Sequence, residues 1–383
     1  MALHFDIAEF EARKTHVLEE MARRKLDAIL LFAPESHYWL TGYDTFGYCF
    51  FQCLVLKRTG TFTLLTRSAD LRQARHTSLI EDIRVWADQP KANPGTQLRE
   101  LLDGLELLGC RIGIEYDTHG LTALNGRSVD EALRSFGTIE DASDLVPTLR
   151  AVKSDAELVY VRRAAELADA ALDSALALIG KGADEAAILA AMQSAVLAGG
   201  GDYPANPFIL GSGADALLCR TKTGRRVLDA EDQVTIEFAG VYRLYHAALM
   251  RTVIVGEPTP RHRELHAACV EALHECEGVM RPGNNFGAVF DAHAKVMEAH
   301  GMTRHRLNAC GYSLGARYAP SWMDPPMFYR DNPAEIVPGM ILFAHMVLMD
   351  SDAGAAMCVG RTYLTTEAEP EALSRHGTGL LVR

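Results

Sequence analysis

The stretch of residues 233–256 constrains the fold of this chain more than any other. Apolar residues alternate with other residues along two runs of it, a pattern typical of two half-buried strands. Ala239-Gly240 and the Val-Tyr-Arg that follows predict the bend between these strands. We therefore expect a long hairpin that carries Glu237 on its first strand and Ala248 on its second.

Bulk composition argues against several classes of protein. The 383 residues are enough for two domains with buried cores or for one large domain. The net charge is −12 and no run of Lys or Arg stands out, so we expect neither nucleic acid nor an anionic membrane as a partner. No stretch approaches the ~20 apolar residues that span a bilayer, and the charged N-terminus lacks a signal-peptide core. We expect a cytoplasmic protein.

The eight cysteines are scattered along the chain, with no Cys-x-x-Cys pair and no zinc-knuckle spacing. This distribution favours reduced, mostly buried thiols over a disulfide framework. Cys219 is a weak candidate for a nucleophile, and the alternative is a buried, inert thiol.

The first part of the chain has the pattern of an α/β layer domain. An amphipathic helix is expected over residues 8–25, and further helices from about residue 69 and near residues 98–108. The runs that predict strands cover residues 28–33, 53–57, 62–66, 83–86 and 111–115. Because strands alternate with helices, we expect an α/β domain over residues 1–148, with residues 35–48 as a loop.

The second part, residues 149–383, has the pattern of an α+β domain. Ser154 and Glu157 have the spacing of a capping box, which predicts the start of a long helix. The expected helices cover residues 155–179, 184–197, 262–280 and 286–300. From His305 onward the sequence is typical of strands and loops, so helices flank paired strands in this domain.

Several short motifs occur in an informative order along the second domain. They are Phe208-Ile-Leu-Gly-Ser-Gly213, Met250-Arg-Thr252, Cys310-Gly-Tyr-Ser-Leu-Gly315 and Pro338-Gly-Met340. In this order and spacing they resemble the creatinase/aminopeptidase family, whose catalytic domain is called the pita-bread fold. The resemblance extends over essentially the whole chain. It implies a pita-bread α+β catalytic domain behind a smaller N-terminal domain like those of creatinase and prolidases.

The resemblance also shows where this chain departs from the peptidases of the family. Those enzymes use two aspartates, one histidine and two glutamates to hold two metals, which activate a bridging water. The matching positions here are Glu237, Ala248, Tyr312, His345 and a position near Gly360. One carboxylate and one imidazole do not make a two-metal site. We therefore expect no metal and no cofactor, and treat a metal-dependent Xaa-Pro peptidase as the rival interpretation.

Creatinase and ectoine hydrolase are the members of the family that this chain resembles more closely. The Tyr245-His246 pair and the Gly311-Tyr-Ser-Leu-Gly315 run, followed by Tyr318, Pro320, Ser321 and Trp322, are similar to ectoine hydrolases. The following residues 323–329 depart from that pattern, which is compatible with a sibling subfamily acting on another substrate. The histidine that serves as base in creatinase falls at or beside Arg220.

The resemblance places several candidate residues in one site. His345 and His246 are candidate bases, because histidine titrates near neutral pH. Glu237 is a candidate to orient an imidazole or to grip a cationic substrate group, and Tyr312 to donate to an oxyanion. Arg220 and Arg317 are candidates to bind a substrate carboxylate. Ordinary packing or a solvated strand face remains the alternative for each.

Aromatic residues of the N-terminal domain supply further candidates. Tyr43, Phe46 and Tyr48 lie in a segment that, by the resemblance, reaches the active site of the partner in a homodimer. Together with Trp322 they would line the pocket around a small substrate. Simple packing of the loop on its own domain is the alternative.

The sequence therefore favours a homodimeric hydrolase that cleaves a C–N bond in a small zwitterionic compound without metal. Ectoine-like cyclic amidines and guanidino or N-modified amino acids are the candidate substrates. A metal-dependent Xaa-Pro dipeptidase and a non-catalytic ligand-binding protein on the same scaffold are the alternatives.

Overall fold

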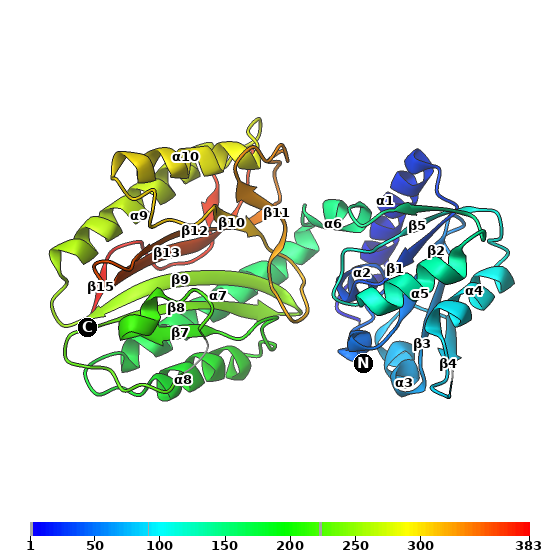
Figure 1. Cartoon of the computed structure of the whole chain (residues 1–383), viewed down its shortest axis with the longest axis horizontal. Coiled ribbons are helices and arrows are strands. Elements are labelled where there is room, and N and C mark those ends of the chain that lie inside the picture. The colour runs from blue at the N-terminus through cyan, green and yellow to red at the C-terminus, as the bar shows by residue number, and fades with distance from the viewer. Residues whose placement is uncertain (1–2, 91, 222–223) are drawn as a thin grey trace. The chain divides into compact units, whose positions relative to one another are not determined.

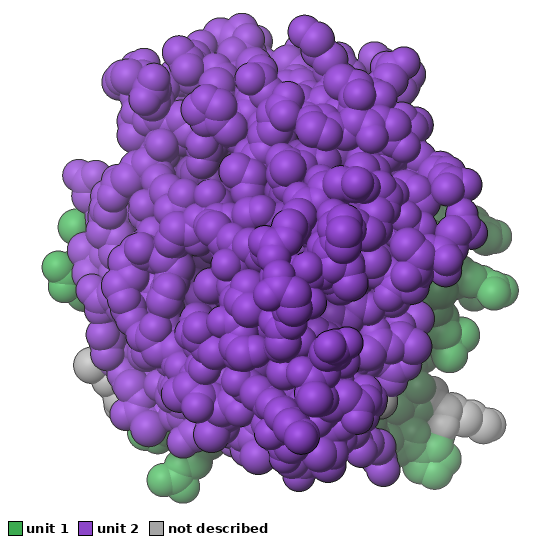
Figure 2. Space-filling model, turned by 90° about the vertical axis from the view of Figure 1, so that its left-hand side faces the viewer, with its two compact units in different colours: residues 1–150 green, residues 151–383 purple. Residues whose placement is uncertain are grey.

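A computed structural model describes residues 3–90, 92–221 and 224–383 of the chain. The chain forms two compact units, residues 1–150 and 151–383, which Figure 2 shows in different colours. The border that the sequence predicted lies after residue 148. No helix of the described residues is long and apolar enough to cross a membrane.

In the described part of unit 1, six strands form one mixed sheet in the order β4-β3-β2-β1-β5-β6 (Figure 1). The central strand β1 pairs antiparallel with β2 and parallel with β5, so the sheet is part hairpin and part crossover. The strands are β1 (Ala28–Leu31), β2 (Cys53–Lys57), β3 (Phe62–Arg67), β4 (Asp82–Trp86), β5 (Arg111–Ile114) and β6 (Thr138–Asp141).

Helices cover both faces of this sheet. Two separate hydrophobic clusters result because neighbouring residues of β1 point to opposite faces: Leu30 belongs to one cluster and Ile29 to the other. The helices are α1 (Ile7–Arg24), α2 (Pro34–Thr41), α3 (Ser68–Thr77), α4 (Pro94–Gly104), α5 (Ala123–Leu133) and α6 (Leu145–Arg150). The prediction of a loop over residues 35–48 was wrong for its first part, because residues up to Thr41 belong to helix α2. Pro34 suits a first helical position, and Gly42 ends the helix at φ +80°.

In unit 2, the described strands form a nine-stranded sheet whose main path runs β11-β10-β12-β13-β9-β8-β7. Neighbours along this path are antiparallel, while β15 pairs parallel with β9. The strands are β7 (Ile209–Ser212), β8 (Asp232–Tyr242), β9 (Tyr245–Val255), β10 (Ala309–Ser313), β11 (Asp324–Tyr329), β12 (Ile341–Asp350), β13 (Ala355–Leu364), β14 (Glu371–Ala372) and β15 (Leu381–Val382).

Two helical pairs pack on the same face of this curved sheet, so in Figure 1 α9 and α10 lie above its strands and α8 lies below them. One pair, α7 (Asp155–Leu178) and α8 (Glu185–Ala198), packs through α7 on β8 and β9. The other, α9 (Pro260–Val279) and α10 (Phe286–Ala299), packs through α9 on β12 and β13. The capping box at the start of α7 is confirmed: Ser154 Oγ accepts from Glu157 N, and the Glu157 carboxylate accepts from Ser154 N. This is the pita-bread fold.

The hairpin β8–β9 exists, but its bend is not where the sequence predicted it. Arg243 and Leu244 form the two-residue turn, both with positive φ, as a type I′ hairpin turn requires. Gly240 lies inside β8 instead. A Cβ there would stand 2.0 Å from the carbonyl oxygen of Ala164 in α7, so the glycine lets the helix lie close to the strand.

The strand register determines which side chains share the face of the sheet turned away from the helices. Glu237 lies an odd number of residues from Gly240, which faces α7, so its side chain points to the other face. Paired residues of neighbouring strands share a face, and Glu237 pairs with Met250. Met250 pairs with Gly360, and Gly360 with His345. These four residues form one row across β8, β9, β13 and β12.

A buried carboxylate holds the segment that passes over one end of this row. Glu185, 2% exposed at the start of α8, accepts hydrogen bonds from Ser212 N (2.9 Å) and Ser212 Oγ (2.5 Å). Its second oxygen accepts from Arg225 N (2.9 Å) and Arg226 N (3.1 Å). Glu185 therefore ties together both ends of the stretch that carries Cys219 and Arg220.

We predict that Glu185→Gln lowers the free energy of unfolding by about 2–4 kcal/mol, because an amide nitrogen would then face backbone N–H donors in the interior. Urea denaturation of the whole chain measures this loss. The matched control is Glu367→Gln at an exposed position, which should change stability by less than about 0.5 kcal/mol. Equal stability of the two variants would contradict the role assigned to Glu185.

Candidate active site

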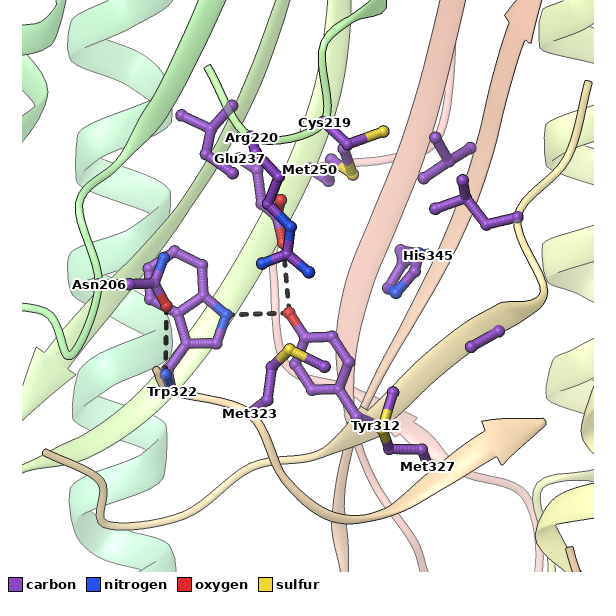
Figure 3. A pocket seen from close by; sticks show the side chains of 14 residues that line it. Asn206, Cys219, Arg220, Glu237, Met250, Tyr312, Trp322, Met323, Met327 and His345 are labelled. Carbon is purple, nitrogen blue, oxygen red and sulfur yellow. Dashed lines mark hydrogen bonds between the residues drawn. The ribbon is translucent and has the colours of Figure 1, made fainter. Parts of the chain in front are cut away.

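A cavity of about 150 Å³ opens over the row formed by Glu237, Met250, Gly360 and His345 (Figure 3). The polar residues that line it are Asn206, Cys219, Arg220, Glu237, Tyr312 and His345. Its other walls are apolar or aromatic and include Met250, Met323, Met327 and Trp322. The cavity is well below the ~300–1,000 Å³ of sites for drug-sized ligands, so it suits a small molecule.

Glu237 is the carboxylate among the described residues that line the cavity. Burial raises its pKa to about 7, although the hydrogen bond from Tyr312 and the positive charge of Arg220 act in the opposite direction. A carboxyl group with a pKa near 7 exchanges protons at neutral pH, which is the behaviour required of a general acid or base.

Tyr312 and Trp322 are hydrogen-bonded to each other beside this carboxylate. Tyr312 Oη donates to Glu237 Oε1 at 3.2 Å and accepts from Trp322 Nε1 at 2.9 Å, as the dashed lines of Figure 3 show. Burial and the neighbouring Glu237 raise the pKa of Tyr312 well above its ordinary value, so the phenol stays protonated. Tyr312 faces the cavity because it pairs with Phe343 of β12, which lies two residues from His345 and so on the same face of the sheet.

His345 lines the cavity from β12, at the far end of the row from Glu237. Its ring packs 5.6 Å from the ring of Tyr312 and 5.4 Å from that of Phe343. Burial lowers its pKa to about 4, so the ring is neutral at pH 7. Its buried Nδ1 has no hydrogen-bond partner among the described residues, which leaves this nitrogen for water or a ligand.

Arg220 and Cys219 line the cavity from the stretch that Glu185 anchors. The guanidinium group of Arg220 points into the cavity between Trp322 and His345 (Figure 3). Burial and the charge of Glu237 raise the pKa of Cys219, which makes its thiol a poor nucleophile at neutral pH.

The structure thus brings together Arg220, Glu237, Tyr312, Trp322 and His345, and it places other candidates elsewhere. His246, expected as a base, is fully buried behind Trp322, with the two ring centroids 6.3 Å apart. Its Nε2 accepts from Ala205 N at 3.0 Å. Burial lowers its pKa to about 4, so it is a neutral structural residue rather than a base in contact with substrate.

Arg317, expected to bind a substrate carboxylate, does not line the cavity either. Its side chain is half-buried and pairs with Asp324 at 3.2 Å, and its Nε donates to Ser321 O at 3.3 Å. These contacts stabilise the segment that carries Trp322. Arg317 supports the wall of the site, and its charge is already paired.

The three aromatic candidates of unit 1 differ from one another. Tyr43 is 1% exposed and packs in the core of that unit, with its ring stacked 6.2 Å from His37, so it presents no surface to a ligand. Phe46 is 82% exposed and Tyr48 is half-buried. The role of Phe46 and Tyr48 in the site of a partner subunit, and the homodimer itself, stay predictions.

Sequence analysis missed Asn206 and the three methionines of the cavity. Met250 could have been found, because the pairing of a hairpin bent at residues 243–244 places it opposite Glu237. Asn206 lies in a loop and reaches the site through a hydrogen bond from Trp322 N to its Oδ1 at 3.2 Å. No local pattern in the sequence signals that contact.

Comparison with known proteins decides the family. The model of metallopeptidase family M24 matches residues 159–367, and that of the creatinase/prolidase N-terminal domain matches residues 13–152. The chain belongs to metallopeptidase family M24. The resemblance to the creatinase/aminopeptidase family is therefore confirmed.

Two curated relatives and one solved structure illustrate the range of this family. Ectoine hydrolase of Halomonas elongata is 27% identical, covering 100% of this chain and 99% of its own. Xaa-Pro dipeptidase of Pyrococcus horikoshii is 21% identical, covering 81% and 82%. The structure of prolidase from Thermococcus sibiricus has a TM-score of 0.87 at 16% identity, covering 98% and 99%, and shows the shared fold. The two curated relatives are thus a hydrolase of ectoine and a dipeptidase.

The site of this M24 protein does not fit the two-metal centre that the family name implies. Gly360 lies at or near the position expected for the last metal-binding glutamate, and a Cβ there would lie 2.8 Å from the ring of Phe343 and 2.9 Å from Met250 Cβ. A carboxylate side chain at position 360 would therefore require Phe343 or Met250 to shift. Over residues 3–90, 92–221 and 224–383, no three His, Cys, Asp or Glu side chains gather closely enough to hold a metal ion.

The raised pKa of Glu237 predicts a pH-dependent change in stability that needs no substrate. A carboxyl group whose pKa is raised on folding contributes stability below its unfolded pKa of 4.5 and loses it as pH rises through about 7. Glu237→Gln should therefore gain stability relative to the wild type between pH 4.5 and 8. We expect roughly 2 kcal/mol, because one pKa unit corresponds to about 1.4 kcal/mol and the cavity is open to water.

Urea denaturation at a series of pH values measures this difference, with Glu367→Gln as the matched control. A difference between wild type and Glu237→Gln that stays constant with pH would show that Glu237 has an ordinary pKa.

Proposed function

We propose that this M24 protein hydrolyses a C–N bond in a small zwitterionic compound without using a divalent metal. The observation that carries the proposal is Glu237, a carboxylate with a pKa raised to about 7 beside a proton donor in a small cavity. The full-length similarity to ectoine hydrolase supports the reaction class.

The residues of the cavity supply the groups that such a reaction needs. The carboxylate of Glu237 can take a proton from water or attack the substrate carbon itself, and both routes require its deprotonated form. Tyr312 keeps its proton at neutral pH and donates a hydrogen bond. If Glu237 deprotonates water, the hydroxide attacks, the C–N bond breaks, and the proton held by Glu237 goes to the leaving nitrogen. If Glu237 attacks instead, a proton from solvent goes to the leaving nitrogen, and water then hydrolyses the covalent intermediate and frees the carboxylate.

Charge and size narrow the class of substrate. Arg220 directs a guanidinium group into the cavity, which suits a substrate carboxylate because the two groups form a bidentate pair (Figure 3). Trp322 and the three methionines offer apolar and polarisable contacts to the carbon skeleton. Neutral His345 offers a hydrogen bond to a polar group of the substrate. A compact amino-acid derivative satisfies all three features.

The second candidate is a metal-dependent Xaa-Pro dipeptidase, which the similarity to Xaa-Pro dipeptidase of Pyrococcus horikoshii favours. The positions of the metal ligands argue against it, since Ala248 and Gly360 offer no donor atoms from their side chains. The third candidate is a ligand-binding protein without catalysis. Only a test for turnover distinguishes it from the two enzymes.

Turnover of a panel of small C–N compounds tests the proposal. The panel contains ectoine, creatine, N-acylated and guanidino amino acids, and Xaa-Pro dipeptides. We expect hydrolysis of ectoine, creatine, or an N-acylated or guanidino amino acid. Glu237→Gln should lower kcat at least about 10³-fold, because the carboxylate takes part in the chemical step. Glu367→Gln is the control and should keep wild-type kcat.

We also expect kcat/KM to fall as pH decreases below about 7, because the carboxyl form of Glu237 is inactive. Hydrolysis of Xaa-Pro dipeptides alone, or full activity of Glu237→Gln, would contradict the proposal. Saturable binding of a panel compound without any product would favour the non-catalytic reading.

A further inference from the structure

The three side chains Trp322, Tyr312 and Glu237 form a hydrogen-bonded chain that has only one possible direction. The indole Nε1–H of Trp322 is a donor and cannot accept a hydrogen bond. It lies 2.9 Å from Tyr312 Oη, so this oxygen is the acceptor. The hydroxyl proton of Tyr312 therefore cannot be shared with Trp322, and it is donated to Glu237 Oε1 at 3.2 Å.

This direction makes the two oxygens of Glu237 inequivalent. Oε1 is held as an acceptor as long as Tyr312 donates to it. A proton placed on Oε1 would point at the hydroxyl proton of Tyr312. The Tyr312 hydroxyl could avoid this clash only by rotating, and it would then no longer donate to Glu237. A proton that Glu237 gains must therefore go to Oε2, and Oε2 is the oxygen that exchanges protons or attacks.

The indole ring is fixed from several sides. Trp322 is 1% exposed, and its backbone N–H donates to Asn206 Oδ1 at 3.2 Å. The imidazole of His246 packs against the indole at 6.3 Å and binds Ala205 N, next to Asn206. The direction of these hydrogen bonds is thus set by groups that do not titrate at neutral pH, since burial lowers the pKa of His246 to about 4.

We propose that Trp322 is a positioning residue that fixes the direction of the Tyr312–Glu237 hydrogen bond and so assigns proton exchange to Oε2 of Glu237. The direction of this bond stands on geometry alone, whereas its consequence for catalysis rests on the proposed function. Without the indole N–H, Tyr312 can rotate and accept a proton from Glu237. The protonated form of Glu237 then gains a partner, and its pKa rises further.

The test is a titration of Glu237 that needs no turnover. Protein labelled with ¹³C at the glutamate carboxyl carbon is titrated by NMR, and Glu237→Gln assigns the signal. The wild-type midpoint is expected near 7. In Trp322→Phe we expect it about one pH unit higher, the size of the one hydrogen bond between neutral groups that protonated Glu237 gains. A second variant with benzothienylalanine at position 322 keeps the shape of indole but lacks its N–H, and should show the same shift.

Trp86→Phe is the matched control. It removes an indole N–H that donates to Phe51 O in unit 1, and it should leave the midpoint of Glu237 unchanged. An unchanged midpoint in folded benzothienylalanine protein would overturn the inference. A raised midpoint in that protein supports it even if Trp322→Phe does not fold.

Kinetics then separate this inference from the proposed function. With an active substrate, the pH profile of kcat/KM in the 322 variants should move up by the same shift, a loss of about fivefold at pH 7 that recovers at pH 9. A loss that is equal at both pH values would show a merely structural role and contradict the inference. A raised midpoint with no turnover of any panel compound keeps the hydrogen-bond direction and rejects the proposed function.

Discussion

The register of four antiparallel strands determines what this site can do. Pairing across β8, β9, β13 and β12 aligns Glu237, Met250, Gly360 and His345 on one face of the sheet. In this row Glu237 is joined by Met250 and Gly360, which carry no carboxylate, and by an imidazole that burial keeps neutral. Burial raises the pKa of Glu237 to about 7, against the opposing effects of the Tyr312 hydrogen bond and the Arg220 charge. In this site the fold raises the pKa of a single carboxyl group, Glu237.

Features that depend on local physics could be predicted from the sequence. The capping box of α7 and the alternation of the hairpin strands follow from side chains that act on their own backbone or on one adjacent face. The ordered motifs located the fold and brought Glu237, Tyr312, His345 and Trp322 to attention. These residues do lie together, because the family pattern reflects a fixed sheet register.

Features that depend on packing between distant segments could not be predicted. The bend of the hairpin was misplaced because Gly240 serves close contact with α7, a reason that no local pattern reveals. His246 was predicted as a base because histidine titrates near neutral pH and this residue lies on the hairpin, yet Trp322 packs against it in the folded chain. Asn206 enters the site through a loop contact. The pKa of Glu237 depends on burial, which only the folded chain defines.

Turnover of metal-stripped protein tests metal-independent hydrolysis most directly. The protein is dialysed against a strong chelator, its metal content is measured by elemental analysis, and kcat is determined on the same sample with the substrate found in the panel. Metal-independent hydrolysis predicts an unchanged kcat when the protein holds far less than one equivalent of any divalent metal. Loss of activity on stripping, with recovery when one divalent metal is restored to stoichiometry, would contradict it.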